Sequence, residues 1–204
     1  METGEREKAG IMTKTTTNYE KHTSKNPLKK FFFNNFESNL ISLIAPLNPK
    51  KILDAGCGEG FTLERLYELK IGKDLEGIDA SKVAIETGKK LYPHLNIKIG
   101  DIYNLPYKDN SFDLVVCTEV LEHLEDPKRA LREIIRVSKK YLLLTVPNEP
   151  WFLLSNFTRW GKDIGHINHW SSEGFEEFIK QNSNLKIIKK VHPFPWTMIL
   201  AERT

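Results

Sequence analysis

The sequence holds only two cysteines, little excess of charge, and no apolar run that approaches the roughly 20 residues needed to span a bilayer. Two cysteines do not make the disulfide framework of a small secreted protein, and the polar, charged beginning of the chain is unlike a secretory signal. A net charge of +3 is too small to argue for a nucleic-acid partner. We therefore expect a cytoplasmic protein without a membrane span, with Cys57 and Cys117 as free thiols.

The 204 residues are enough for one well-buried core and too few for two ordinary domains. Residues 1–18 are polar and show no apolar periodicity, so we expect a disordered tail there, with Met12 as a candidate start of translation. We expect residues 19–204 to form a single domain. Apolar side chains recur every three or four positions between Pro27 and Leu47, which predicts an amphipathic helix.

A cluster of cationic and aromatic residues lies in the first part of this predicted helix: Lys25, Lys29, Lys30, Phe31, Phe32 and Phe33. Basic residues beside aromatic ones are a feature of some nucleic-acid surfaces. The simpler interpretation is the solvated face of an amphipathic helix, and the low net charge favours it.

Residues 52–60 (ILDAGCGEG) combine a short apolar strand, an acidic residue and three alternate glycines directly before a helical pattern. Alternate glycines let the backbone turn sharply and approach a ligand, and the next helix start offers free N–H groups. A dinucleotide loop usually follows Gly-x-Gly-x-x-Gly, but here the third glycine, Gly60, comes one position early. The pattern therefore indicates a nucleotide-type cofactor and weakens the dinucleotide interpretation.

Further alternating strand and helix patterns follow this loop. Residues 74–79 predict a second strand ending in Asp79, a carboxylate able to accept two hydrogen bonds from vicinal ribose hydroxyls. Residues 95–100, 112–117 and 141–146 predict three more strands. In an open α/β sheet of this kind, ligands bind beyond the carboxyl ends of the strands.

The glycine loop, Asp79, Asp101 and the stretch 105–117 (LPYKDNSFDLVVC) together resemble the motifs of class I S-adenosylmethionine-dependent methyltransferases, of the small-molecule type found in ubiquinone biosynthesis. The resemblance covers most of the chain. It implies an α/β, Rossmann-like fold with a seven-stranded, mostly parallel sheet of order 3-2-1-4-5-7-6, the last strand antiparallel, and helices on both faces. Residues 183–190 and 195–201 would be its last two strands.

The same resemblance implies S-adenosylmethionine as the cofactor and assigns residues to its parts. The glycine loop would carry the methionine portion, with Asp54 orienting the loop or reaching the ammonium group through water. Asp79 would bind the ribose, Asp101 would lie near the adenine amino group, and Ile102 would pack on the ring. The expected cofactor set is Asp54, Gly56, Cys57, Gly58, Gly60, Asp79, Ala80, Asp101, Ile102 and Cys117.

Residues 118–124 (TEVLEHL) follow the fourth strand, where a substrate nucleophile would lie. If they form a helical turn, Glu119, Glu122 and His123 share one face. Such a cluster can bind a divalent cation, or it can orient the substrate and accept a proton, or His123 can be purely structural. Downstream histidines could complete the site. The candidate catalytic residues are His123, Glu119 and His169, and the candidate metal ligands are Glu119, Glu122, His123 and His166.

Residues 147–170 are rich in aromatic side chains and are expected to form an insertion that covers the substrate or packs on the core. The sequence as a whole predicts a methyltransferase for a small-molecule acceptor, with O-methylation favoured. The alternatives are an RNA-modifying methyltransferase with a divalent metal at Glu119, Glu122 and His123, a non-catalytic cofactor-binding module, and a dinucleotide oxidoreductase.

Overall fold

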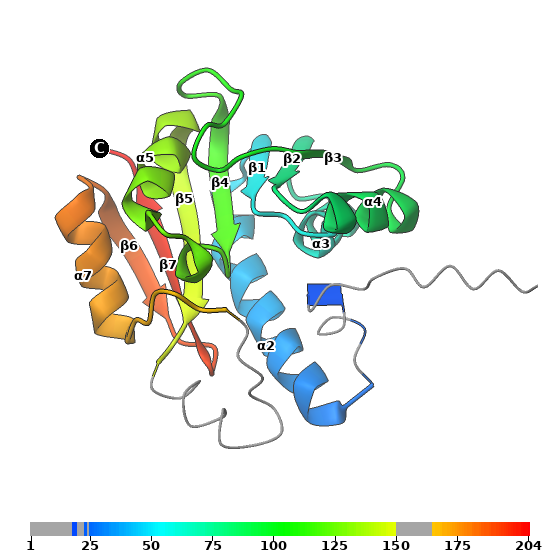
Figure 1. The fold of residues 1–204 in the computed structure, drawn as a ribbon, viewed down its shortest axis with the longest axis horizontal. Coiled ribbons are helices and arrows are strands. Elements are labelled where there is room, and N and C mark those ends of the chain that lie inside the picture. Colours follow the sequence, from blue (N-terminus) through cyan, green and yellow to red (C-terminus); the bar gives the residue numbers. More distant parts are fainter. Residues whose placement is uncertain (1–17, 20–22, 24, 150–164) are drawn as a thin grey trace, which may run out of the picture.

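A computed structural model describes residues 18–19, 23, 25–149 and 165–204 (Figure 1). Its centre is a seven-stranded sheet of order β3-β2-β1-β4-β5-β7-β6. The five strands from β1 to β5 pair in parallel, whereas β7 lies antiparallel between β5 and β6. The strands are Lys51–Ala55 (β1), Asp74–Asp79 (β2), Asn96–Ile99 (β3), Phe112–Thr118 (β4), Ser138–Pro147 (β5), Lys186–Val191 (β6) and Trp196–Glu202 (β7). The expected fold and strand order are confirmed.

Helices cover both faces of this sheet. The described helices are Pro27–Ile44 (α2), Phe61–Glu68 (α3), Lys82–Leu91 (α4), Pro127–Val137 (α5) and Ser172–Asn182 (α7), with short 3-10 turns at Ala45–Leu47 (η1) and Leu121–His123 (η2). On one face, Leu131 of α5 and Phe175 of α7 belong to the same buried core cluster as Val115 of β4. On the other face, Leu43 of α2 packs with Val116 of the same strand. Within the described residues, no helix is both long and apolar enough to cross a membrane.

The start and end of α2 follow from local chemistry. The Asn26 side chain accepts hydrogen bonds from the N–H groups of Leu28 and Lys29, and Pro27 occupies the first helical position, where no donor is needed. The helix ends at Ile44, and Pro46 lies in the 3-10 turn η1 that follows. The predicted helix between Pro27 and Leu47 is therefore an α-helix with a 3-10 turn as its last part.

The loops at the carboxyl edge of the sheet are held close to one another. The N–H groups of Gly56 and Cys57 both donate to the carbonyl of Ile78, at 2.7 and 3.1 Å, which joins the loop after β1 to β2. Gly56 has a φ of +90°, and a Cβ built on it would lie 2.3 Å from Cγ2 of Val120, the residue two positions beyond β4. Only a glycine allows the loop after β1 to meet the end of β2 and the segment after β4 at this distance.

The predicted tail and insertion fall largely outside the described residues. Of the tail 1–18, only Asn18 is described, and of the insertion 147–170, residues 150–164 are not. Trp170, at the end of the insertion, packs against the core, with its ring centroid 5.5 Å from that of Phe175 and 5.0 Å from that of Phe178.

Candidate active site

A cavity of about 480 Å³ opens at the carboxyl edge of the sheet. Its wall comes from the ends of β1 to β4, with aromatic side chains of α2 and β7 on one side. Seven residues of the predicted cofactor set line it, namely Gly56, Cys57, Gly58, Asp79, Ala80, Asp101 and Ile102. The structure thus brings most of the predicted set to one surface, at the edge where open α/β sheets bind ligands.

The two acidic residues of this set have their carboxylates fixed by backbone donors. In Asp79, Oδ2 accepts from the N–H of Gly58 at 2.8 Å and Oδ1 accepts from the N–H of Ser81 at 2.7 Å. In Asp101, Oδ1 accepts from the N–H of Tyr103 at 2.8 Å. Each carboxylate oxygen can accept a further hydrogen bond, so both groups can still meet hydroxyl or amino donors of a ligand.

Three predicted cofactor residues do not line the cavity. Gly60, with a φ of +89°, caps α3, and a Cβ on it would lie 3.0 Å from Cδ1 of Leu95. Cys117 is fully buried in the core, and its neighbour Thr118 lines the cavity instead. Burial, and the charge of Asp54, hold the pKa of the Cys117 thiol well above its ordinary value.

Asp54 is the third of these residues, and it lies beneath the glycine loop. It is 1% exposed, and its Oδ1 has no hydrogen-bond partner among the described residues. Burial, and to a smaller extent the negative charge of Asp79, raise the pKa of Asp54 from 3.8 to about 7. The position fits an indirect role in holding the loop better than direct contact with a ligand.

Glu119 does not share a helical face with Glu122 and His123, and that expectation is wrong. Its φ is +57°, outside the 3-10 turn η2, so its side chain leaves in another direction. One carboxylate oxygen accepts from Nε1 of Trp196 at 2.6 Å and the other from Oγ1 of Thr145 at 3.4 Å. Glu119 and His123 nevertheless both line the cavity, on the segment that follows β4.

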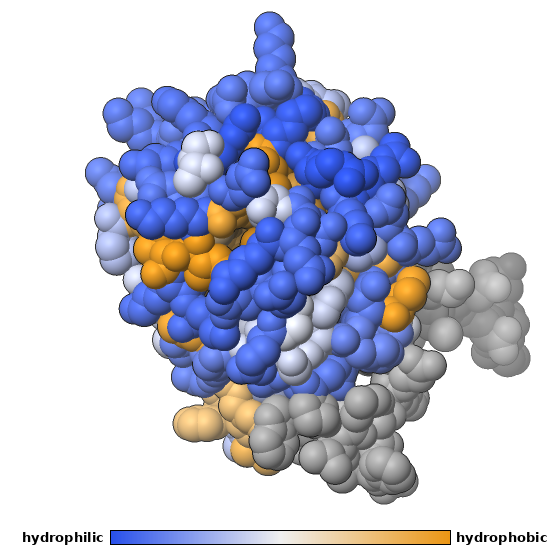
Figure 2. Space-filling model, turned by 90° about the vertical axis from the view of Figure 1, so that its left-hand side faces the viewer, coloured by the Kyte–Doolittle hydropathy of each residue, from blue (hydrophilic) through white to orange (hydrophobic). Residues whose placement is uncertain are grey.

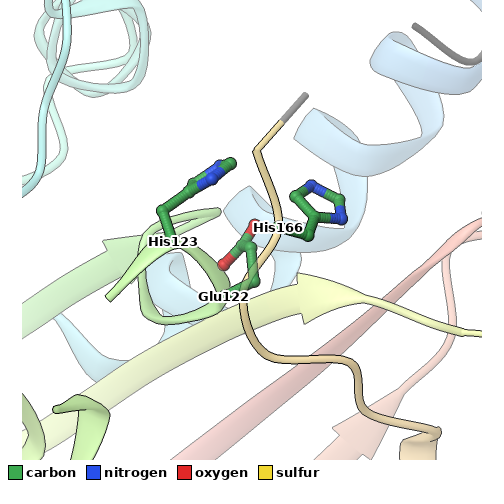
Figure 3. Close-up of side chains that lie close together, drawn as sticks. All are labelled: Glu122, His123 and His166. Atoms are coloured by element: carbon green, nitrogen blue, oxygen red, sulfur yellow. The ribbon is translucent and has the colours of Figure 1, made fainter. Parts of the chain in front are cut away.

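Glu122, His123 and His166 form a cluster beside the cavity (Figure 3), and one possible ligand atom from each lies within 4.8 Å of the others. Nδ1 of His123 is 3.0 Å from the carbonyl of Gly165, so Nδ1 carries the proton and Nε2 is left to accept. The backbone carbonyl of Glu122 accepts the N–H groups of Ile167 and Asn168, at 2.8 and 2.9 Å. These bonds hold the segment that carries His166 against η2.

A second cluster shares His166 and contains a residue that the sequence did not point to. Oε1 of Glu149, two residues beyond β5, lies 3.4 Å from Nδ1 of His166 and 3.5 Å from Nδ1 of His169. The side chains of Glu149 and His166 are each 8% exposed, whereas that of His169 is 49% exposed. His169 is not among the residues lining the cavity, so the structure places this catalytic candidate outside it. Glu149 could have been noticed as an acidic residue at the same sheet edge as Asp79.

Other cavity residues were also missed by the sequence patterns. Asn18 lines the cavity, and its Nδ2 donates to Oε2 of the buried Glu59 at 2.5 Å. Phe33, Phe36 and Trp196 form the aromatic side of the wall. Trp196 begins β7, which the strand order places next to β5, so the family topology alone was enough to suggest it.

Comparison with known proteins agrees with this geometry. Residues 53–144, from β1 into β5, match the family model described as a methyltransferase domain. The chain carries a class I S-adenosylmethionine-dependent methyltransferase domain. Among curated relatives, the mitochondrial ubiquinone biosynthesis O-methyltransferase of Schizosaccharomyces pombe is 33% identical over 153 residues, which cover 69% of this chain and 54% of that protein. Norajmaline N-methyltransferase of Rauvolfia serpentina is 34% identical over 113 residues, covering 52% of this chain and 36% of that protein.

A solved structure supports the fold of this methyltransferase domain. Magnesium protoporphyrin IX methyltransferase from Synechocystis PCC 6803, determined with bound SAH, superposes with a TM-score of 0.65 at 17% identity and covers 88% of each chain. The present chain spans between 36% and 54% of the length of the two curated relatives named above.

Proposed function

We propose that this protein transfers a methyl group from S-adenosylmethionine to a small-molecule acceptor, with a hydroxyl oxygen as the favoured nucleophile. The observation that carries the proposal is that seven of the ten predicted cofactor residues line the same cavity as Glu119 and His123. The family match supports the cofactor. Different parts of the cavity wall suit the cofactor and the acceptor.

The glycine loop and the two fixed carboxylates account for the cofactor side. Gly56 and Gly58 bring backbone close to the ligand, as suits the amino-acid portion, and Asp79 supplies charged acceptors for the ribose hydroxyls. Methyl transfer from a sulfonium is an in-line displacement, so the protein accelerates it mainly by positioning the nucleophile and excluding water. The carboxylates held by backbone donors are suited to that positioning role.

The part of the cavity formed by the segment after β4 supports an acceptor group that must lose a proton. His123 has Nδ1 turned to the Gly165 carbonyl, which leaves Nε2 as the possible proton acceptor. Glu119 is held by Trp196 and Thr145 and adds negative charge beside the same space. The two relatives named above are an O-methyltransferase and an N-methyltransferase, and both acceptor types bear such a proton.

Cofactor binding can be tested by calorimetry with S-adenosylhomocysteine. Asp79→Ala should weaken binding by about tenfold to a hundredfold, because hydrogen bonds to a charged group contribute roughly 1.5 to 3 kcal/mol each. Asp74→Ala, at the other end of β2, is the matched control and should bind as the wild type does. Equal affinities of the two variants would remove Asp79 from the cofactor site.

The acceptor can be tested with S-adenosylmethionine carrying a labelled methyl group and a panel of phenols, catechols, amines and short RNA. We expect label on the oxygen of a phenolic compound. Label on RNA alone would favour the RNA-modifying alternative, and cofactor binding without any transfer would favour a non-catalytic module. Binding of NAD without affinity for S-adenosylhomocysteine would establish the dinucleotide alternative.

We also propose a divalent cation at Glu122, His123 and His166, a cofactor that the geometry allows. The residues fit such an ion, because one carboxylate and two imidazoles converge and the Gly165 carbonyl fixes the His123 tautomer that ligation by Nε2 requires. Bound there, the ion would take the place of the proton-acceptor role of His123 Nε2 and would polarise acceptor oxygens in the neighbouring cavity, which lowers the pKa of an acceptor hydroxyl. Glu119, which the sequence had added to this set, bonds to Trp196 instead.

Calorimetric titration with Mn²⁺ and Co²⁺ tests the cation directly. His166→Ala should lose binding, whereas His94→Ala, an exposed histidine paired with Glu64, should keep it. Methyl transfer should also fall with a chelator and return with the metal. Titrations of wild type and His166→Ala that show no difference would contradict the proposal.

A further inference from the structure

The beginning of α2 and the turn between β6 and β7 together carry an exposed apolar surface. We call Leu28, Phe31, Phe32 and Phe194 the aromatic patch. Leu28 is 50% exposed, Phe31 65% and Phe194 48%. The rings are in contact, with centroids 5.7 Å apart for Phe31 and Phe32 and 5.5 Å apart for Phe32 and Phe194. Figure 2 shows apolar surface at the lower end of the molecule, the end where Figure 1 places these two segments.

Positive charge accompanies this patch. Lys25, Lys29 and Lys30 lie in the same stretch of chain, and the first turn of α2 contains no acidic residue. The first acidic residue along α2 is Glu37, whose Oε2 lies 3.3 Å from Nε of Arg65. The exposed apolar side chains of the patch and the three lysines are therefore close together in the chain.

We propose that the aromatic patch docks this protein on the surface of an anionic lipid membrane. Phenylalanine and leucine side chains insert at the boundary between headgroups and acyl chains, while lysines remain among the anionic headgroups. Each lysine near such a surface strengthens binding by about fivefold, the equivalent of roughly 1 kcal/mol. Leu28 has no ring to stack on a base, so a nucleic acid is the less suitable partner.

Helix α2 contributes both to the patch and to the aromatic side of the cavity. On the same helix, the rings of Phe33 and Phe36 lie 5.4 and 5.0 Å from the ring of Trp196, and all three side chains line the cavity. The docked orientation places the aromatic side of the cavity next to the bilayer. If the proposed methyl transfer holds, an acceptor dissolved in the membrane could enter from that side.

The experiment measures binding to vesicles by flotation, with vesicles of phosphatidylcholine alone and of phosphatidylcholine with an equal amount of phosphatidylglycerol. The wild type should bind the anionic vesicles, and the double variant Phe31→Ser, Phe194→Ser should bind them about tenfold more weakly. Leu91→Ser, which removes another exposed apolar side chain at the end of α4, is the matched control and should bind as the wild type does. Exchange of the three lysines for glutamine should remove the preference for the anionic vesicles. Circular dichroism checks that each variant is folded.

Several results would overturn the inference. One is a wild-type protein that does not bind anionic vesicles. Another is a double variant that binds these vesicles as strongly as Leu91→Ser does. Binding of single-stranded RNA without vesicle binding would assign the patch to a nucleic acid, and dimerisation lost in the double variant without vesicle binding would assign it to a second copy of the chain. Vesicle binding needs no cofactor, so a protein that floats with vesicles but does not bind S-adenosylhomocysteine would contradict the proposed function alone.

Discussion

Asp54 should make the folded protein less stable as the pH rises through the acidic and neutral range. Its pKa is raised from 3.8 to about 7 in the folded protein, first by burial and second by the charge of Asp79. Between these two values the folded state holds a proton that the unfolded chain has released. Stability therefore falls as the pH rises from 3.8 to about 7, and the loss is complete above pH 7. About three pH units at roughly 1.4 kcal/mol each correspond to about 4 kcal/mol.

Asp54→Asn removes this titration while keeping the shape of the side chain. The variant should be more stable than the wild type at pH 8, by up to about 4 kcal/mol, and equally stable near pH 4. Urea unfolding followed from pH 4 to pH 8 measures the difference, with Asp74→Asn, an exposed acid at the beginning of β2, as control. Parallel pH curves for wild type and Asp54→Asn, or a less stable variant at pH 8, would refute the reasoning. If Asp54→Asn is more stable but binds S-adenosylhomocysteine more weakly, the Asp54 carboxylate contributes to ligand binding at the expense of stability.

Three further changes have definite expected outcomes. Gly56→Ala should abolish cofactor binding and destabilise the fold by about 2 to 3 kcal/mol, because the added Cβ would meet Val120 at 2.3 Å. Calorimetry and urea unfolding measure the two effects. Gly174→Ala is the control, because its Cβ would meet nothing closer than 3.4 Å. Asp113→Asn should lower stability at pH 7, because the N–H groups of Lys51 and Lys50 hold the pKa of that carboxyl below 3.8. The difference in stability between wild type and variant should vanish as the pH falls below the pKa that Asp113 has in the folded state. Equal stability of the two proteins at pH 7 would contradict this expectation. Trp196→Phe should reduce turnover about tenfold through loss of the 2.6 Å hydrogen bond to Glu119, with cofactor affinity within about twofold; unchanged turnover in steady-state kinetics would remove Glu119 from the reaction.

The fold was predictable because each strand and each connection has a local signal. Asp74–Asp79 was placed correctly as β2. The start of α5 also has a local signal, because the Asp126 side chain accepts from the N–H of Arg129 and Pro127 occupies the first helical position. Strand ends were less certain. The sequence predicted that β5 begins near Tyr141, whereas it begins at Ser138. The first residues were missed because they include two exposed lysines and lack the apolar run that indicated the strand.

The site was predictable only as far as its residues come directly from strand ends. Cys117 and Thr118 illustrate the limit, because β4 is buried on both faces and its sequence has no alternation to show which side chain faces the cavity. The left-handed φ of Glu119 depends on contacts such as the bond to Trp196, 77 residues further along the chain. Asn18 reaches Glu59 from 41 residues away, which no local pattern reports.

His166 faces two acidic residues, and an imidazole ring has only two nitrogen atoms. Nδ1 is turned to Glu149, so whatever binds Nε2 decides whether hydrogen remains on the atom facing that carboxylate. Glu149 in turn lies beside the exposed ring of His169. His166 therefore couples a ligand at its Nε2 to the Glu149 carboxylate, which itself lies next to a solvent-exposed imidazole.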